Sequence, residues 1–245
     1  MAERTLRVCA LYPDLMNIYA DRGNLILLER RCAWRGIGFT VTAAGLGDRI
    51  DPDAHDLFYL GGGQDRDQAL CAQDLVDVKR EALHAAAARG AAILAVCGGY
   101  QLLGHSYALG DEELPGIGLV DLRTVREEGP RLIGNVAIEV ELPGTAGPRV
   151  LAGFENHGGR TLLGRSATPL GRVLKGHGND GRSGFEGIRQ GNVVGTYLHG
   201  PLLPKNAWFA DWLVQRALGL DEPPAALDDG FEDAAHASAR RAAGV

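Results

Sequence analysis

Cys97 is the residue in this sequence whose surroundings are most typical of a nucleophile. Residues 91–96 are small or apolar and predict a buried strand, while Gly98 and Gly99 lead into an apolar run that predicts a helix. A strand that turns directly into a helix leaves the turn residue above the sheet, beside free helix N–H groups that favour a thiolate. Most cysteines are simply small core residues, so it is this context that predicts acyl-transfer chemistry.

A thiol nucleophile needs a base, and His199 has the most suitable position among the seven histidines. Residues 192–198 predict a β-branched strand, and Gly200 and Pro201 follow the histidine, which should therefore lie at the rim of a sheet. An imidazole there can accept the proton of Cys97 near neutral pH. A structural rim histidine is the alternative, because composition alone does not distinguish the two.

A run of glycines, 61–63, follows the apolar segment 57–60. Consecutive glycines at a strand end can offer backbone N–H groups to an anion, and a tetrahedral oxyanion needs two such donors. We expect one donor near Gly62 or Gly63 and the second at Gly98. A tight turn is the plain alternative, and a phosphate loop is disfavoured because no Gly-Lys-Ser/Thr follows.

The elements that would position these residues alternate between strand-like and helix-like patterns, which predicts an α/β domain with a mainly parallel sheet. In the first part of the chain we expect strands at 6–11, 39–43, 57–60 and 93–96 and helices at 15–34, 74–89 and 100–109. The later part predicts antiparallel strands at 119–125, 136–142, 150–154 and 193–198, closed by a helix at 207–218.

Composition excludes several classes of protein. The 245 residues are 45% hydrophobic and 23% charged, with a net charge of −6 and no basic stripe that nucleic-acid binding would require. The four cysteines form no CxxC pair, so we expect no metal site. Neither a signal sequence nor a transmembrane segment is recognisable, which predicts a cytoplasmic protein with reduced thiols.

Two regions are expected from these patterns, a single domain over residues 1–220 and a tail over 221–245. The tail holds six acidic residues and two arginines and is rich in Ala and Pro. Such a composition predicts a solvated and flexible end.

The glycine turn 61–63, the elbow 96–103 and the strand end 195–200 together resemble the class I glutamine amidotransferases. The loop 154–161 is similar to that of the CobB/CobQ-like branch, which includes the cobyric acid synthases. The resemblance implies a flavodoxin-like three-layer fold with a mostly parallel central sheet. It also implies glutamine hydrolysis through a Cys97 thioester with His199, and substrate binding by Arg131, Gly62, Gly63, Gly98 and Gln101.

Segments 11–24 and 131–135 resemble more closely the GatD family, the glutaminase subunits of lipid II isoglutaminyl synthases. That resemblance implies a heterodimer with a MurT-like Mur-ligase subunit. The ligase would use ATP and the released ammonia to amidate the D-glutamate of lipid II to D-isoglutamine, in peptidoglycan synthesis. It implies no cofactor in this subunit.

One position departs from the family pattern. Many class I amidotransferases have Glu two residues after the histidine, where this chain has Pro201. We hypothesise that a carboxylate of the partner completes the orientation of His199. Three alternatives remain: an amidotransferase for a cobyrinate-type or other carboxylate, an inactive binding module on the same fold, and a cysteine hydrolase that needs no ammonia acceptor.

Overall fold

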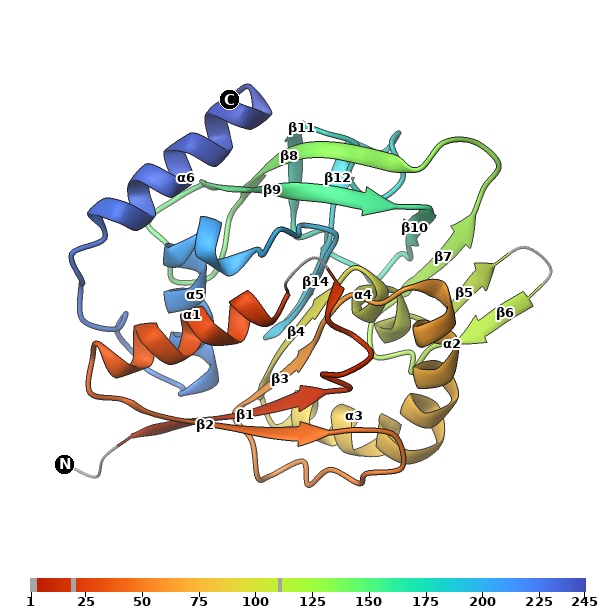
Figure 1. Ribbon diagram of the computed structural model, residues 1–245, viewed down its shortest axis with the longest axis horizontal. Helices are drawn as coiled ribbons and strands as arrows, with labels where there is room; N and C mark the ends of the chain where they lie inside the picture. Colours follow the sequence, from red (N-terminus) through yellow and green to blue (C-terminus); the bar gives the residue numbers. More distant parts are fainter. Residues whose placement is uncertain (1–3, 19–20, 110–111) are drawn as a thin grey trace.

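A six-stranded sheet forms the centre of the computed structural model, which describes residues 4–18, 21–109 and 112–245 (Figure 1). The strand order is β13-β14-β4-β3-β1-β2, and all neighbours are parallel except β13, which is antiparallel at one edge. The strands are β1 (Thr5–Leu11), β2 (Gly38–Ala44), β3 (Leu57–Leu60), β4 (Ala92–Val96), β13 (Ile188–Gln190) and β14 (Val193–Thr196).

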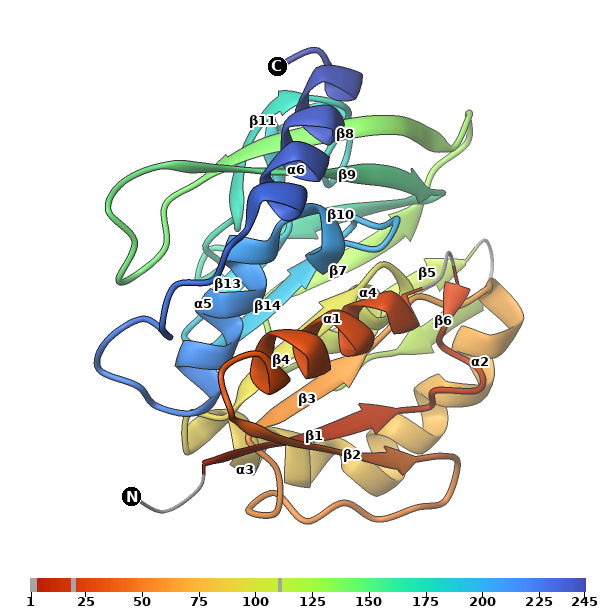
Figure 2. The same cartoon turned by 60° about the vertical axis from the view of Figure 1, so that its left-hand side comes forward.

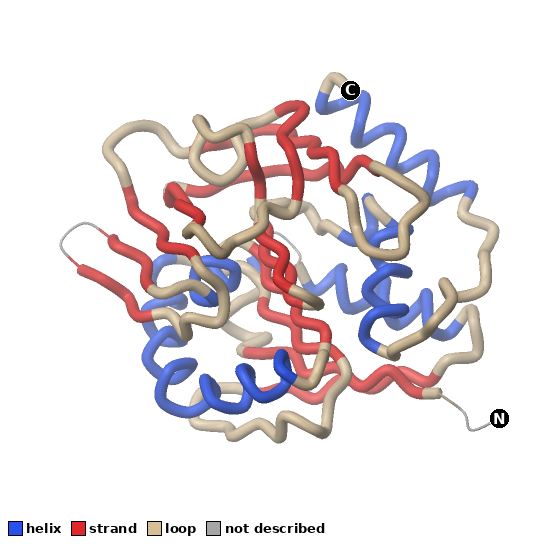
Figure 3. The backbone as a smooth tube through the Cα atoms, turned by 180° about the vertical axis from the view of Figure 1, so that it is seen from behind, coloured by secondary structure: helices blue, strands red, loops and turns tan. Residues whose placement is uncertain are grey.

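Helices cover both faces of this sheet. Helices α1 (Arg22–Ala33) and α5 (Ala207–Ala217) lie against one face (Figure 2). The opposite face carries α2 (Asp65–Asp74), α3 (Arg80–Ala88) and the short α4 (Gly98–Leu103) (Figure 3). A π-helical turn, Leu75–Lys79, joins α2 to α3. The expected three-layer fold with a mostly parallel sheet is therefore confirmed.

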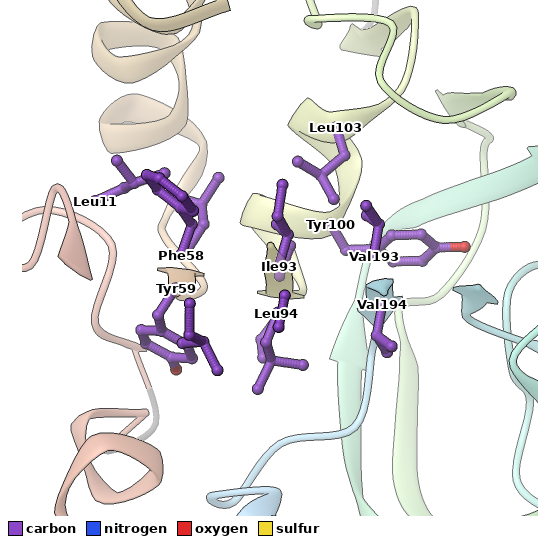
Figure 4. Close-up of a cluster of buried hydrophobic side chains, with 14 of the residues drawn as sticks. Leu11, Phe58, Tyr59, Ile93, Leu94, Tyr100, Leu103, Val193 and Val194 are labelled. Carbon is purple, nitrogen blue, oxygen red and sulfur yellow. The ribbon is translucent and has the colours of Figure 1, made fainter. Parts of the chain in front are cut away.

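Central strands are buried on both faces, as the continuous apolar runs predict. Phe58, Ile93 and Val193 lie in register across β3, β4 and β14 and point to one side, while the residues that follow each of them point to the other (Figure 4). All three are at most 4% exposed. This packing leaves only the strand ends available for chemistry.

Two smaller, mostly antiparallel sheets extend the domain, but the strand expected to be antiparallel at 193–198 was wrongly placed: it is β14, which pairs parallel to β4 in the central sheet. One has the order β10-β7-β5-β6 and the other β12-β11-β8-β9. Their strands are β5 (Ser106–Leu109), β6 (Glu112–Pro115), β7 (Leu122–Arg126), β8 (Leu132–Val140), β9 (Arg149–His157), β10 (Gly159–Leu163), β11 (Gly171–Lys175) and β12 (Phe185–Glu186).

Three predicted helices were wrong in extent. The helix expected at 74–89 is the later part of a longer helical stretch that begins with α2 at Asp65. The helix expected at 15–34 begins only at Arg22, because the described residues before it turn over the glycine run, with the Ile18 N–H donating to the Gly62 carbonyl. The helix expected at 100–109 ends at Leu103, and the following residues form β5. Apolar spacing alone does not separate a short helix followed by a strand from one longer helix.

The C-terminal segment differs from the expected flexible tail. Residues Gly230–Ala243 form helix α6, which packs along β8, β9 and the 3₁₀ helix Leu203–Lys205. The Asn135 amide donates to the Ala242 carbonyl at 2.9 Å, and a ring nitrogen of His236 lies 2.9 Å from the Lys205 carbonyl. The segment is therefore part of the packed structure.

A buried arginine explains why the tail packs. Arg31 of α1 has a fully buried side chain that bonds both Asp211 of α5 and Asp229, the residue before α6. Its Nε donates to Asp211 at 2.8 Å and one of its terminal nitrogens donates to Asp229 at 2.9 Å. A buried guanidinium needs such partners, so at least one acidic residue of the tail, Asp229, is used within the fold.

Replacing Arg31 with Ala should lower the free energy of unfolding by about 3 kcal/mol. This is the lower end of the range for breaking a buried pair, because both aspartates are partly exposed. Urea denaturation measures the change. Arg30→Ala, an exposed neighbour on the same helix, is the matched control and should shift stability by less than about 0.5 kcal/mol. Equal effects would contradict this role of Arg31.

Candidate active site

Three neighbouring parallel strands carry the predicted site at the same edge of the sheet. Strands β3, β4 and β14 are adjacent, and their carboxyl ends lead into the glycine run 61–63, Cys97 and the segment ending at His199. Parallel strands place their carboxyl ends together, and open α/β sheets bind ligands there. Groups far apart in the sequence are therefore brought into one place.

Cys97 stands on the expected sharp turn between β4 and α4. Its backbone has φ of 50° and ψ of −107°, a strained conformation for a residue with a side chain. The Cys97 N–H donates to the Thr196 carbonyl at 2.8 Å, which ties the turn to β14. The elbow geometry predicted from the sequence is confirmed.

Gly62 lies between the thiol and the imidazole. A Cβ atom built on Gly62 would lie 3.1 Å from His199 Cε1 and 3.2 Å from Cys97 Cβ. The two side chains therefore flank one point, and a side chain at position 62 would push into both. Glycine is needed here for this close approach, in addition to any role of its N–H group.

The imidazole of His199 is fully buried and held from two directions. Its backbone exchanges two hydrogen bonds with Phe154 of β9, at 2.8 and 3.2 Å. Its Nδ1 lies 3.5 Å from Asp21 Oδ1, and the other Asp21 oxygen accepts the Gly62 N–H at 2.9 Å. Asp21 is also fully buried, so this ion pair is shielded from water.

Charge around His199 favours its protonated form. Burial lowers the pKa of this imidazole, but the negative Cys97 sulfur and the Asp21 carboxylate more than offset that effect and raise it to about 10. At neutral pH the site therefore favours an imidazolium beside Cys97, a charge that would stabilise negative charge on the sulfur during nucleophilic attack.

Asp21 is a site residue that sequence reasoning missed. With Pro201 in place of the usual Glu, the sequence does not identify which Asp or Glu of this chain orients His199. Pro201 instead packs against Gly23 of α1, and Asp21, immediately before that helix, faces the imidazole. Asp21 lies inside the helix expected at 15–34, so the local pattern gave no signal for this role, and only the later helix start at Arg22 places it beside His199. At 3.5 Å the contact is long, so completion by a partner stays a prediction.

Of the expected oxyanion donors, only two remain available. The Gly62 N–H is already committed to Asp21, which leaves those of Gly63 and Gly98. A Cβ built on Gly98 would lie 3.0 Å from the Gly63 nitrogen, so the two N–H groups are neighbours. Neither has a hydrogen-bond partner within residues 4–18, 21–109 and 112–245. Two adjacent donors beside a nucleophile suit a tetrahedral oxyanion.

Cys97 opens into a cleft of about 400 Å³. Arg131 and Asn156 line the same cleft, and Arg131 is fixed there by donating from Nε to the Asn156 side chain at 2.8 Å and from a terminal nitrogen to its carbonyl at 2.9 Å. The complete lining is Ile18, Gly63, Gln64, Asp65, Arg66, Cys97, Arg131 and Asn156. The structure thus brings the predicted arginine to the nucleophile.

Gln101 is not brought into the cleft. Its side chain is buried behind the elbow, where it accepts a hydrogen bond from Gln68 at 2.8 Å and donates to the Tyr197 hydroxyl at 3.0 Å. Tyr197 in turn stacks on His157 with ring centroids 3.5 Å apart. Gln101 therefore supports the strand that leads to His199, and its predicted contact with substrate is not seen.

A second buried carboxyl stands behind His199. Glu186 of β12 is fully buried and accepts the Tyr197 N–H at 2.6 Å and the Thr196 hydroxyl at 2.9 Å. Burial raises the pKa of Glu186 to about 8, against the opposing effect of these two bonds. Glu186 therefore holds the last residues before His199 in place while keeping its proton at neutral pH.

No three His, Cys, Asp or Glu side chains of the described residues gather as a metal ion would require. Among the same residues, no helix is long and apolar enough to span a bilayer.

Asp21→Asn should lower the pKa of His199, because it removes a negative charge that helps to raise it, while an amide oxygen still accepts the Gly62 N–H. We expect the rate of Cys97 alkylation by iodoacetamide at pH 7 to fall about tenfold, which corresponds to a loss of about 1.4 kcal/mol of charge stabilisation. Asp14→Asn, an exposed change on the same loop, is the control and should react like the wild type. An unchanged rate in Asp21→Asn would contradict the contact.

Glu186→Gln should change how stability depends on pH. The folded protein keeps a proton on Glu186 up to about pH 8, whereas the unfolded chain releases it near pH 4.5. The wild type therefore loses free energy of unfolding from this group as pH rises from about 5 to 8, by up to ~1.4 kcal/mol per pH unit.

The variant lacks this loss, so its stability relative to the wild type should increase across that interval. Urea denaturation at pH 5, 6, 7 and 8 measures the difference. The exposed change Glu128→Gln should track the wild type at every pH. A difference that stays constant with pH would mean that Glu186 is ionised in the folded protein.

Comparison with known proteins agrees with this geometry. The chain matches the CobB/CobQ-like glutamine amidotransferase domain over residues 7–207. It is 40% identical to the lipid II isoglutaminyl synthase (glutamine-hydrolyzing) subunit GatD of Staphylococcus aureus, covering 89% of this chain and 88% of that protein. The corresponding subunit of Streptococcus pneumoniae is 37% identical, with 87% and 80% covered.

The cobyric acid synthase of Pelotomaculum thermopropionicum is 39% identical, but the match covers only 49% of this chain and 25% of that protein. Among solved structures, PurLQS of Thermotoga maritima shares the fold with a TM-score of 0.60 at 21% identity, over 87% of this chain and 95% of that one. The elbow, the histidine strand and the match over most of the length agree: this chain belongs to the CobB/CobQ-like family of glutamine amidotransferases.

Proposed function

We propose that this chain is the glutaminase subunit of a lipid II isoglutaminyl synthase. It hydrolyses L-glutamine and delivers the ammonia to a MurT-type ligase in the cytoplasm. The observation that carries the chemistry is the Cys97–His199 pair beside two adjacent N–H donors. Full-length similarity to two GatD subunits supports the assignment of the acceptor.

The arrangement supports a two-step reaction. The Cys97 thiolate attacks the side-chain carbonyl of glutamine, and the N–H groups of Gly63 and Gly98 stabilise the oxyanion. Protonated His199 donates its proton to the leaving nitrogen, which departs as ammonia, and a thioester remains. Neutral His199 then takes a proton from water, the hydroxide attacks the thioester, and glutamate leaves as the thiolate re-forms.

Arg131 binds the α-carboxylate of glutamine at the cleft, where a guanidinium can form two parallel hydrogen bonds. The chain itself needs no cofactor for this hydrolysis, and ATP is used by the ligase. The ligase activates the α-carboxyl of the D-glutamate in lipid II, and ammonia displaces the activating group to give D-isoglutamine. A corrinoid acceptor is less well supported, because the cobyric acid synthase matches cover only about a quarter of those proteins.

Glutamate release from L-glutamine by the purified chain, alone and with a MurT-type ligase, tests the proposal. Cys97→Ser should lower release by on the order of 10³-fold or more, with an unchanged unfolding midpoint. Stimulation by the ligase is expected because the contact between Asp21 and His199 is long in the lone chain. Equal rates with and without the ligase would rule out completion of the site by the partner. Absence of release in both settings would overturn the proposed function.

A further inference from the structure

A cation and an anion face the cleft beside the nucleophile. Arg131 and Asp65, the first residue of α2, both line the cleft into which Cys97 opens. Arg66 also lines it, so Asp65 is the only acidic side chain among its lining residues. The cleft lining therefore places one negative side chain, Asp65, beside two positive ones, Arg66 and Arg131.

Asp65 is held in a fixed place by a second arginine. Arg126 of β7 donates to Asp65 Oδ2 at 2.8 Å. A Cβ built on Gly158 would lie 3.4 Å from a terminal nitrogen of Arg131 and 3.7 Å from Arg126 Nε. Both guanidinium groups thus flank Gly158, and Asp65 is held on the same rim as Arg131.

The unpaired hydrogen-bonding groups of Asp65 and Arg131 are complementary to an α-amino acid. Asp65 Oδ1 and one terminal nitrogen of Arg131 have no hydrogen-bond partner in the part of the chain that the structure describes. Glutamine carries an ammonium and a carboxylate on a single carbon, so a site that recognises both needs an anion and a cation side by side. Most other primary amides, including glutamine within a peptide, lack this zwitterion.

We propose that Asp65 binds the α-ammonium of glutamine, so that Asp65 and Arg131 together select the free amino acid over other primary amides. The inference rests on the proposed glutaminase function. Without Asp65 the cleft keeps Arg66 and Arg131, whose positive charge repels an ammonium group. Because the Asp65 side chain is 42% exposed and Arg131 is also exposed, each charge should contribute a modest factor to binding.

Steady-state kinetics of Asp65→Asn on two substrates test the proposal. L-glutamine carries the ammonium, and glutaramate is the same molecule without the α-amino group. For L-glutamine we expect KM to rise about tenfold with kcat within about twofold of the wild type, since the group acts in binding. For glutaramate, KM should stay the same or fall. Asp67→Asn, on the same helix but outside the cleft lining, should leave both substrates unaffected.

An equal rise in KM for both substrates would mean that Asp65 only supports the cleft and would overturn the proposal, as would no change in either. Calorimetry of L-glutamine binding to Cys97→Ser, with and without Asp65→Asn, gives a readout that needs no turnover. If the wild type releases no glutamate but Asp65→Asn still weakens this binding about tenfold, the proposed function fails while the ammonium site stands.

Discussion

The carboxylate of Asp21 is the contact on which the rest of the site depends. One of its oxygens accepts the Gly62 N–H and the other faces His199 Nδ1, while its backbone carbonyl accepts the Tyr59 hydroxyl. A single buried residue thereby joins the start of α1 to the ends of β3 and β14. The free-energy cost of burying the Asp21 charge away from water is offset by these hydrogen bonds and by the charged imidazole.

This arrangement has consequences for every neighbouring group. Because the Gly62 N–H is bonded to Asp21, the N–H groups of Gly63 and Gly98 are the adjacent donors left for an oxyanion. Because position 62 has no side chain, the imidazole and the thiol can approach the same point. Because Asp21 already faces the imidazole, position 201 can be a proline that packs against α1 without leaving His199 lacking a carboxylate.

Behind the reactive groups lies a shell of buried hydrogen bonds. Glu186 and Gln101 hold the Tyr197 backbone and hydroxyl, and the Tyr197 ring stacks on His157 and meets Tyr100 edge to face. Every polar group that is paired in such an interior resists movement, because breaking one bond leaves a buried donor or acceptor unsatisfied. The histidine that follows β14 is therefore held on a rigid base, while the cleft-lining charges Asp65 and Arg131 lie on the exposed rim.

Local pattern was enough to determine the parts of this protein that depend on neighbouring residues. Continuous apolar runs predicted the buried parallel strands, and the Cys-Gly-Gly turn predicted the elbow, because burial and backbone freedom are read over a few positions. Only the tertiary structure decided which distant charges meet. Asp21 and the Arg31–Asp229 pair act across 178 and 198 positions of the sequence, and the Gln101 side chain turns inward. Their partners are set by how strands and helices pack and not by their neighbours in the chain.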